Sequence, residues 1–395
     1  MAGLSNAVRA YRSARVREFL RENGYDALIV SSTDWFEWLS NSEIHENVGE
    51  RPIVLVVTAS GNSFALVSEL SRHAIACGAE LGSLWIDTVH KYQECPHLES
   101  RTLREWPDAA AAVLNSAGLA RAKVAVDSLS KPLPRVAALL PGLQLVEPGE
   151  ALRRLRWVKH AEEIATMRRA AALSVWAIGL YHQELRPGRV LKEVDYSVAA
   201  KMSAEAARTM PGENYVISSL FTLSGINSTS PKGDGAASGK VLENNTIAIT
   251  VLGTRLNGVS AEVTRPWLVG SPPAEVVSLL NATRAAQQAS IDASVAGRPV
   301  CGIHTSALEA YARAGVERFF TLRAAHGIGV VMHDFPLTPQ FDERPLLAGE
   351  TYAIEPSLCV PGIGGFRFSD SVAVGAGKPE LITPQDGEKI QRISA

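Results

Sequence analysis

The order of strand-like and helix-like segments constrains this fold more than any other feature of the sequence. Within the first 150 residues, short apolar runs typical of buried strands alternate with stretches in which apolar residues recur at helical spacing. The strand-like runs are 25–30, 52–58, 63–67, 84–89, 123–127 and 143–146, and the helix-like stretches are 4–22, 70–79 and 102–117. Strands separated by helices predict an α/β domain, which we expect to end near Pro148.

The second part of the chain has a different order of elements. Two long amphipathic helices, 151–184 and 191–207, come first. After them come strand-like runs at 215–223, 246–253, 260–269, 352–358 and 366–374, and helices at 273–296 and 303–314. A chain of 395 residues also exceeds what one hydrophobic core usually supports. We therefore expect two domains, an α/β domain over 1–150 and an α+β domain over 151–395.

The composition argues against several classes of function. The formal net charge of -2 gives no general electrostatic reason to expect nucleic acid or an anionic membrane as a partner. No run of eighteen apolar residues occurs, and the N-terminal stretch lacks the apolar region of a signal peptide, so we expect a cytoplasmic protein. Four cysteines are scattered without CxxC spacing and are interpreted as reduced thiols: Cys77, Cys95, Cys301 and Cys359.

The stretch 325–336, Ala-His-Gly-Ile-Gly-Val-Val-Met-His-Asp-Phe-Pro, is the first candidate for the chemistry. His326 and His333 stand seven residues apart and frame a Gly-x-Gly turn. Glycines there permit close approach of a ligand or of a facing strand. Imidazole titrates near neutral pH, so both histidines are candidates for proton transfer or metal binding. Two ordinary histidines on a buried loop are the structural alternative.

A loop between residues 35 and 51 combines aromatic and charged side chains. Trp35 and Phe36 stand at one end of it and Arg51 at the other. Aromatic rings near an arginine form a suitable cap over a small charged ligand. Packing against a neighbouring domain or subunit is the alternative, and the two interpretations are compatible.

Three segments together resemble the pita-bread superfamily that contains methionine aminopeptidase, aminopeptidase P, prolidase and creatinase. They are Ser-Ala-Glu-Val-Thr-Arg at 260–265, the stretch 325–336, and Ile-Glu-Pro at 354–356 followed by Gly-Gly-Phe-Arg-Phe-Ser-Asp at 364–370. The resemblance covers essentially the whole chain, with order and spacing kept. It implies a pita-bread fold (creatinase/aminopeptidase) for residues 151–395 and a creatinase-type α/β domain for residues 1–150.

The peptidases of this superfamily hold two metal ions with two Asp, one His and two Glu. The resemblance maps two of these positions onto Val251 and Ser369, which are not ligands for a hard metal ion. Glu262, His326 and Glu355 stand at the other three positions. A dinuclear site needs bridging carboxylates, so the resemblance implies that none forms here. One ion on the three remaining ligands is the alternative.

These departures resemble creatinase, the metal-free hydrolase of the superfamily. Creatinase also carries Glu at the second Asp position, where Glu262 stands here. Lys232 stands near the place of the catalytic histidine of creatinase. Arg51-Pro52 is similar to the creatinase segment whose arginine reaches a neighbouring active site and binds the substrate carboxylate. The resemblance therefore implies a homodimer with Arg51 contributed across the interface.

The main functional prediction follows from the loss of the metal ligands. Without metal, Glu262 and Glu355 share one cavity as two carboxylates, and a guanidino, amidine or ammonium group relieves their repulsion. We therefore predict a metal-independent, creatinase-like hydrolase that cleaves a non-peptide C–N bond of a small cationic or zwitterionic molecule, without a cofactor. The predicted catalytic residues are His326, His333, Glu262, Glu355 and Lys232, and the predicted substrate-binding residues are Arg51, Trp35, Phe36, Arg367 and Ser369.

Two other functions are consistent with the same residues. The first is a single-metal enzyme, either an Xaa-Pro peptidase or a lyase of the same fold. The second is a non-catalytic binding protein of that fold. For Arg367 the structural alternative is an ion pair with Asp370, and for Ser369 it is a neutral filler of the vacated metal position.

Overall fold

The computed structural model describes residues 3–44, 48–93, 105–129, 132–230, 232, 237–384 and 390–394. The chain divides into two compact units, Met1–Leu155 and Arg156–Ala395. Both contain helices and a sheet, as the alternation of strand-like and helix-like segments predicts.

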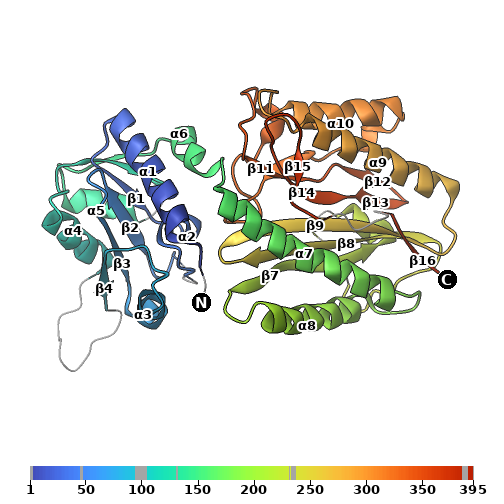
Figure 1. The fold of residues 1–395 in the computed structure, drawn as a ribbon, viewed down its shortest axis with the longest axis horizontal. Helices are drawn as coiled ribbons and strands as arrows, with labels where there is room; N and C mark the ends of the chain where they lie inside the picture. Colours follow the sequence, from blue (N-terminus) through green and yellow to red (C-terminus); the bar gives the residue numbers. More distant parts are fainter. Residues whose placement is uncertain are drawn as a thin grey trace. The chain divides into compact units, whose positions relative to one another are not determined.

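The N-terminal unit is an α/β unit built on a six-stranded sheet with the strand order β4-β3-β2-β1-β5-β6 (Figure 1). β2 pairs antiparallel with β1 and β3, and the other neighbours pair parallel. β1 is buried along its whole length, in agreement with its unbroken apolar run. The strands are β1 (Ala27–Val30), β2 (Val54–Thr58), β3 (Ser63–Ser68), β4 (Thr88–Tyr92), β5 (Lys123–Val126) and β6 (Gln144–Val146).

The helices of this unit begin and end at residues suited to those positions. Ser5 caps the first helix by accepting a hydrogen bond of 3.2 Å from the Ala7 N–H. Gly24 ends it in the left-handed conformation, with φ 63°, two residues beyond the predicted helix-like stretch 4–22. The helices are α1 (Asn6–Asn23), α2 (Thr33–Ser40), α3 (Arg72–Glu80), α4 (Trp106–Ser116), α5 (Leu133–Leu139) and α6 (Glu150–Arg153).

The C-terminal unit is built on an eight-stranded sheet. Its main path is β10-β11-β14-β9-β8-β7, with antiparallel neighbours; β15 pairs with β14, and β16 pairs parallel with β9. A separate pair, β12 (Ser357–Val360) and β13 (Gly364–Arg367), lies beside it. The strands of the large sheet are β7 (Tyr215–Ser224), β8 (Thr246–Leu256), β9 (Val259–Val269), β10 (Ala325–Gly327), β11 (Thr351–Ile354), β14 (Ser369–Ala373), β15 (Glu380–Leu381) and β16 (Gln391–Ile393).

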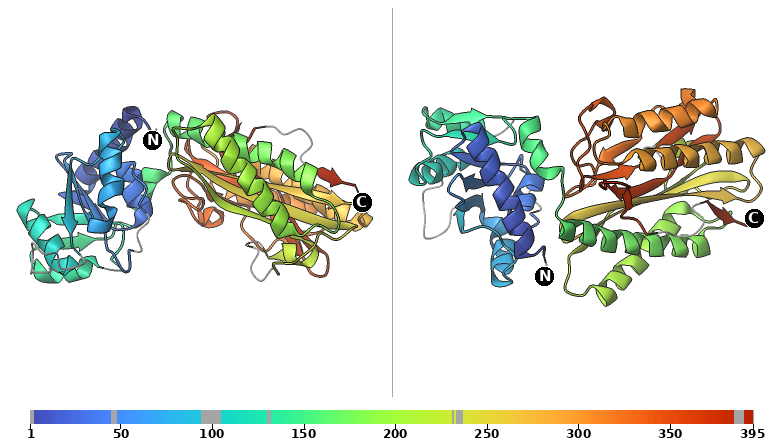
Figure 2. Two further views of the ribbon diagram at one scale, coloured as in Figure 1. Left: turned by 90° about the horizontal axis from the view of Figure 1, so that it is seen from below. Right: turned by 45° about the horizontal axis from the view of Figure 1, so that its top comes forward.

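Two pairs of helices cover opposite faces of this sheet (Figures 1 and 2). α7 (Ala161–Glu184) and α8 (Leu191–Thr209) pack on the face that carries Leu252 and Val263. α9 (Ala274–Ala293) and α10 (Gly302–Arg313) pack on the face that carries Ile247 and Leu268. Side chains alternate along a strand, so Glu262 lies on the same face of β9 as Leu268.

A buried ion pair joins β9 to β14 beneath that face. Arg265 Nη2 lies 2.8 Å from Asp370 Oδ1, and both side chains are almost completely buried. Arg265 Nη1 also donates to the Ser369 carbonyl at 3.0 Å, and Gln287 from α9 donates to Asp370 Oδ2 at 3.0 Å. Because both charges are paired and hydrogen-bonded, the ends of β9 and β14 are held in one register.

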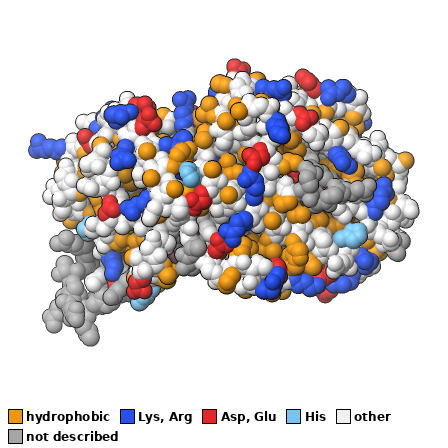
Figure 3. All heavy atoms as spheres, viewed as in Figure 1, with side chains coloured by type: hydrophobic (Ala, Val, Ile, Leu, Met, Phe, Trp, Pro, Cys, Tyr) orange, Lys and Arg blue, Asp and Glu red, His pale blue; other side chains and the backbone are white. Residues whose placement is uncertain are grey.

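The described surface charges and cysteines agree with the expectations drawn from the composition. On the face drawn in Figure 3, the described Lys and Arg side chains are interspersed with Asp and Glu. No helix in the part of the chain that the structure describes combines the length and apolar character needed to span a bilayer. Cys77, Cys301 and Cys359 are free thiols, and Cys95 lies outside the described residues.

Candidate active site

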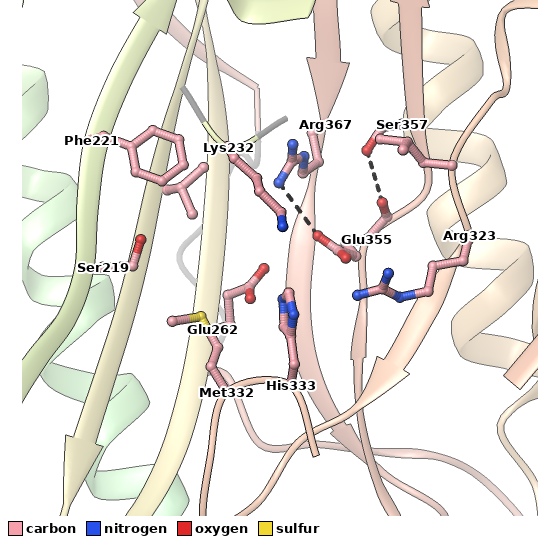
Figure 4. Close-up of a pocket in the computed structure, with 12 residues that line it drawn as sticks. Ser219, Phe221, Lys232, Glu262, Arg323, Met332, His333, Glu355, Ser357 and Arg367 are labelled. Atoms are coloured by element: carbon pink, nitrogen blue, oxygen red, sulfur yellow. Dashed lines mark hydrogen bonds and ion pairs between the residues drawn. The ribbon is translucent and has the colours of Figure 1, made fainter. Parts of the chain in front are cut away.

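A cavity of about 350 Å³ lies in the C-terminal unit, and its volume is near the lower end of the range of about 300–1,000 Å³ that is usual for small-molecule sites (Figure 4). Its apolar lining residues are Phe221, Val251, Leu322 and Met332. Its titratable lining residues are Lys232, Glu262, Arg323, His333, Glu355 and Arg367. The cavity therefore fits a small molecule that has both apolar and charged groups.

His326 lies between the two glutamates that line this cavity. Its Nε2 atom is 3.7 Å from Glu262 Oε2 and 3.4 Å from Glu355 Oε1. Its Nδ1 atom lies 2.9 Å from the Gly327 carbonyl oxygen, so a proton on Nδ1 is held there while Nε2 faces the glutamates. His326 is completely buried, and Glu262 is 3 % exposed. The structure thus brings together three of the predicted catalytic residues.

Backbone hydrogen bonds place each glutamate. The Glu262 N–H donates to Ser371 Oγ at 2.9 Å, which ties β9 to β14 at this point. The Glu355 N–H, just after β11, donates at 2.7 Å to the carbonyl of Ala324, just before β10. Both carboxylates are therefore held by the sheet itself, although the two glutamates are far apart in the sequence.

The electrostatic surroundings shift the pKa values of the two glutamates in opposite directions, and they do the same for the two histidines. Burial opposes ionisation of Glu262, but the charges of His326 and Arg367 outweigh burial and lower its pKa to about 2. Burial and the charge of Glu262 raise the pKa of Glu355. Burial opposes protonation of His326, but the two glutamates raise its pKa overall. Burial and the charge of His326 lower the pKa of His333 to about 4, so His333 is neutral at neutral pH.

The stretch 327–336 folds back so that the two histidines meet. The ring centroids of His326 and His333 are 4.2 Å apart. The Asp334 N–H donates to the Gly327 carbonyl at 2.8 Å. A Cβ atom at Gly327 would overlap the Phe335 carbonyl, and one at Gly329 would overlap the Asp334 carboxylate. The glycines are therefore needed for the close approach that the Gly-x-Gly pattern predicts.

The carboxylate of Asp334 holds the stretch 327–336 in place through backbone hydrogen bonds and an ion pair. Its carboxylate accepts hydrogen bonds from the N–H groups of Val330 and Phe335, at 3.1 and 2.8 Å. Its Oδ1 atom lies 2.8 Å from Arg156 Nη2, and both side chains are 1 % exposed. The sequence analysis missed this pair, because nothing local in the sequence relates Arg156 to a stretch so far along the chain.

Three cations reach the same cavity as the two glutamates. Arg367 Nη1 lies 3.4 Å from Glu355 Oε2. Lys232 and Arg323 extend into the cavity from opposite sides (Figure 4). Arg323 is not among the predicted site residues, although its position three residues before His326 was an available indication. The expected clamp of two free carboxylates around a cationic substrate is therefore wrong, since the carboxylates already face positive side chains.

The donor atoms in this cluster fit one metal ion. Glu262 Oε1 and His326 Nε2 are buried and have no hydrogen-bond partner among the described residues. One ligand atom from each of Glu262, His326 and His333 lies within 4.8 Å of the others. Carboxylate oxygen and imidazole nitrogen are usual ligands of divalent ions such as Zn²⁺. Val251 is apolar and Ser369 neutral and buried, so their positions do not supply the bridging carboxylates of a second ion.

The remaining predicted binding residues belong to the N-terminal unit, whereas the residues that line the cavity belong to the C-terminal unit. Trp35 and Phe36 are buried in α2, where the Trp35 ring packs edge-on against Trp38 at 5.6 Å. Arg51 Nη2 lies 2.9 Å from Glu50 Oε1. Their role in substrate binding stays a prediction.

Comparison with known proteins identifies the family of this chain. Residues 165–376 match metallopeptidase family M24, and residues 12–158 match the creatinase/prolidase N-terminal domain. This chain belongs to metallopeptidase family M24. The predicted superfamily, with its α/β N-terminal domain and pita-bread C-terminal domain, is confirmed.

Similar members of the family are described as dipeptidases. The probable dipeptidase PepE of Mycobacterium tuberculosis is 27% identical over 330 residues, which cover 82% of this chain and 81% of that protein. The Xaa-Pro dipeptidase of Pyrococcus furiosus is 27% identical over 239 residues, 60% of this chain and 66% of that protein. The crystal structure of dipeptidase PepE from Mycobacterium ulcerans superposes with a TM-score of 0.82 at 25% identity and covers 100% of both chains.

These findings overturn the main functional prediction. A metal-independent, creatinase-like hydrolase of a non-peptide C–N bond is wrong for this chain, because its family is one of metallopeptidases and its relatives are dipeptidases. That prediction gave too much weight to Val251 and Ser369. Loss of two ligands argues against a second ion, but it leaves a set of donors that fits one ion.

We predict that Asp334→Asn, which keeps the size of the side chain but removes its charge, destabilises the C-terminal unit. Arg156 is then left buried without its counter-charge, which costs about 3–5 kcal/mol of unfolding free energy. Urea unfolding measures the loss. Glu205→Gln, which disrupts an exposed pair with Arg208 on α8, is the control and should leave stability near that of the wild type. Equal stability of Asp334→Asn and wild type would contradict the assigned role.

Proposed function

We propose that this chain is a metal-dependent peptidase that hydrolyses the peptide bond of a dipeptide. The observation that carries this proposal is the cluster of Glu262 and His326, both buried, with the exposed His333, whose ligand atoms converge at a cavity of small-molecule size. The dipeptidase relatives support the choice of a peptide bond as the bond that is cleaved. The volume of about 350 Å³ favours a dipeptide over a long peptide.

Glu262, His326 and His333 would hold one divalent ion, which when bound polarises a carbonyl oxygen and lowers the pKa of water. Glu355 lies outside this ligand set, with Oε1 3.4 Å from His326 Nε2. Its carboxylate is the group within the cavity that accepts a proton from the attacking water and returns it to the leaving amine. Arg367, 3.4 Å from Glu355 Oε2, holds the carboxylate in that orientation.

The other side chains bind and orient the substrate. Lys232 extends into the cavity from the side opposite Arg323, where its charge can bind the C-terminal carboxylate of the dipeptide (Figure 4). Phe221, Val251 and Met332 form an apolar wall that accepts a substrate side chain and excludes water. The binding of a dipeptide would thus bring its scissile bond between apolar contacts and the charged cluster.

We predict that the protein, stripped with a chelator, binds one Zn²⁺ or Mn²⁺ per chain in calorimetric titration. His326→Ala and Glu262→Ala should each weaken binding by at least about tenfold, since each removes one of three ligands. Glu309→Ala, at an exposed position of α10, is the matched control. Binding of two ions per chain at comparable affinity would refute the single-ion assignment.

Turnover provides the direct test of the peptidase proposal. The ion-loaded protein should hydrolyse a panel of dipeptides, and removal of the ion should abolish the reaction. Glu355→Gln should lower kcat by about 10²- to 10⁴-fold, the usual contribution of a general base, while one ion still binds. Absence of dipeptide hydrolysis with Zn²⁺, Mn²⁺ and Co²⁺ would rule the proposal out.

A homodimer with Arg51 contributed across its interface also remains a proposal, as does a cytoplasmic location. Both rest on the sequence, the homodimer on the resemblance to creatinase. Sedimentation equilibrium should give twice the chain mass of 42.3 kDa, and a single-chain mass would contradict the homodimer.

A further inference from the structure

Arg323 is a charged group in the cavity wall that the proposed reaction does not use. It precedes β10, is half-buried, and points into the cavity beside Glu355 (Figure 4). Its Nε atom is buried without an acceptor. No ion pair joins it to any acidic residue in the described parts of the chain. A guanidinium in a cavity wall that has no hydrogen-bond acceptor is suited to bind a ligand whose oxygen atoms accept its hydrogen bonds.

The acids of the cavity already have closer partners. Glu355 lies 3.4 Å from Arg367 and 3.4 Å from His326. Glu262 lies 3.7 Å from His326. Lys232 likewise forms no hydrogen bond or ion pair with another described residue. The cavity therefore has two cationic side chains without a close counter-charge, and a bound divalent ion increases the positive excess.

We propose that Arg323, together with Lys232, selects dipeptides that carry an acidic side chain. The two cations match the two carboxylates of such a peptide, the C-terminal one and the side-chain one. Guanidinium binds carboxylate through two parallel N–H groups, so we assign the side-chain carboxylate to Arg323 and the C-terminal carboxylate to Lys232. This inference rests on the proposed dipeptidase function and names its substrate class.

The shape of the cavity agrees with this orientation. Phe221 and Met332 lie on the side of the cavity away from Arg323, so the other residue of the dipeptide meets apolar surface (Figure 4). An acidic side chain placed against Phe221 and Met332 would lie away from the guanidinium of Arg323 and would lose hydration at the apolar surface. The position of the cations thus decides which end of the dipeptide carries the acid.

The test compares Ala-Glu with Ala-Gln, which have the same shape and differ in one charge. We expect kcat/KM of the ion-loaded wild type to be about 10- to 100-fold higher for Ala-Glu, the range expected for one hydrogen bond to a charged group. Arg323→Met should remove this preference, and Arg323→Glu should reverse it towards Ala-Lys. Arg313→Met, at an exposed position of α10, is the matched control and should keep the preference.

Binding to the ion-loaded Glu355→Gln variant, measured by calorimetry, separates this inference from the peptidase proposal. Selective binding of Ala-Glu that Arg323→Met abolishes supports the subsite even if neither peptide is hydrolysed. Equal hydrolysis of Ala-Glu and Ala-Gln by the wild type overturns the subsite and leaves the peptidase proposal standing. Failure of Ala-Glu to bind also overturns it. The wild-type comparison decides the question if the Arg323 variants do not fold.

Discussion

The site depends on the interaction of two carboxylates, that of the buried Glu262 and that of the partly buried Glu355, with one buried imidazole. Glu262 and Glu355 lie 3.7 and 3.4 Å from Nε2 of His326, which is itself completely buried, so water screens these charges only weakly. Burial of two negative charges is costly unless positive groups or a metal ion compensate them. Arg367 supplies one such group through its ion pair with Glu355, and the unpaired donor atoms of Glu262 and His326 leave room for an ion.

The remaining buried charges of the C-terminal unit serve to hold that cluster in place. Arg265 and Asp370 tie β9 to β14 beneath it, and Arg156 and Asp334 hold the stretch that carries His333. In each pair both partners are nearly inaccessible and make further hydrogen bonds. Pairs of this kind add little net stability compared with apolar residues, but they allow only one arrangement of the segments that they join. The geometry of the ligand atoms is a consequence of that arrangement.

The wrong functional prediction has a physical cause. From the sequence, Val251 and Ser369 indicate the loss of two metal ligands, and the remaining acids then appear to need a cationic substrate. In the structure, Arg323, Arg367 and Lys232 reach the same cavity from three separate segments. The net charge of a cavity is the sum over the side chains of all its walls. Its sign therefore cannot be inferred from the acidic residues alone. Once the cations are counted, the cavity favours an anionic group in the substrate.

The sequence by itself determined the fold, the family resemblance and the residues Glu262, His326 and Glu355, because apolar periodicity and short motifs are local properties of the chain. It also predicted the close approach of backbone at the Gly-x-Gly turn. Only the tertiary structure decided that Arg323 faces these acids and that Arg156 pairs with Asp334. Coulomb energy depends on distance in space and not on distance along the chain, so these partners become evident only when the sheet brings the segments together.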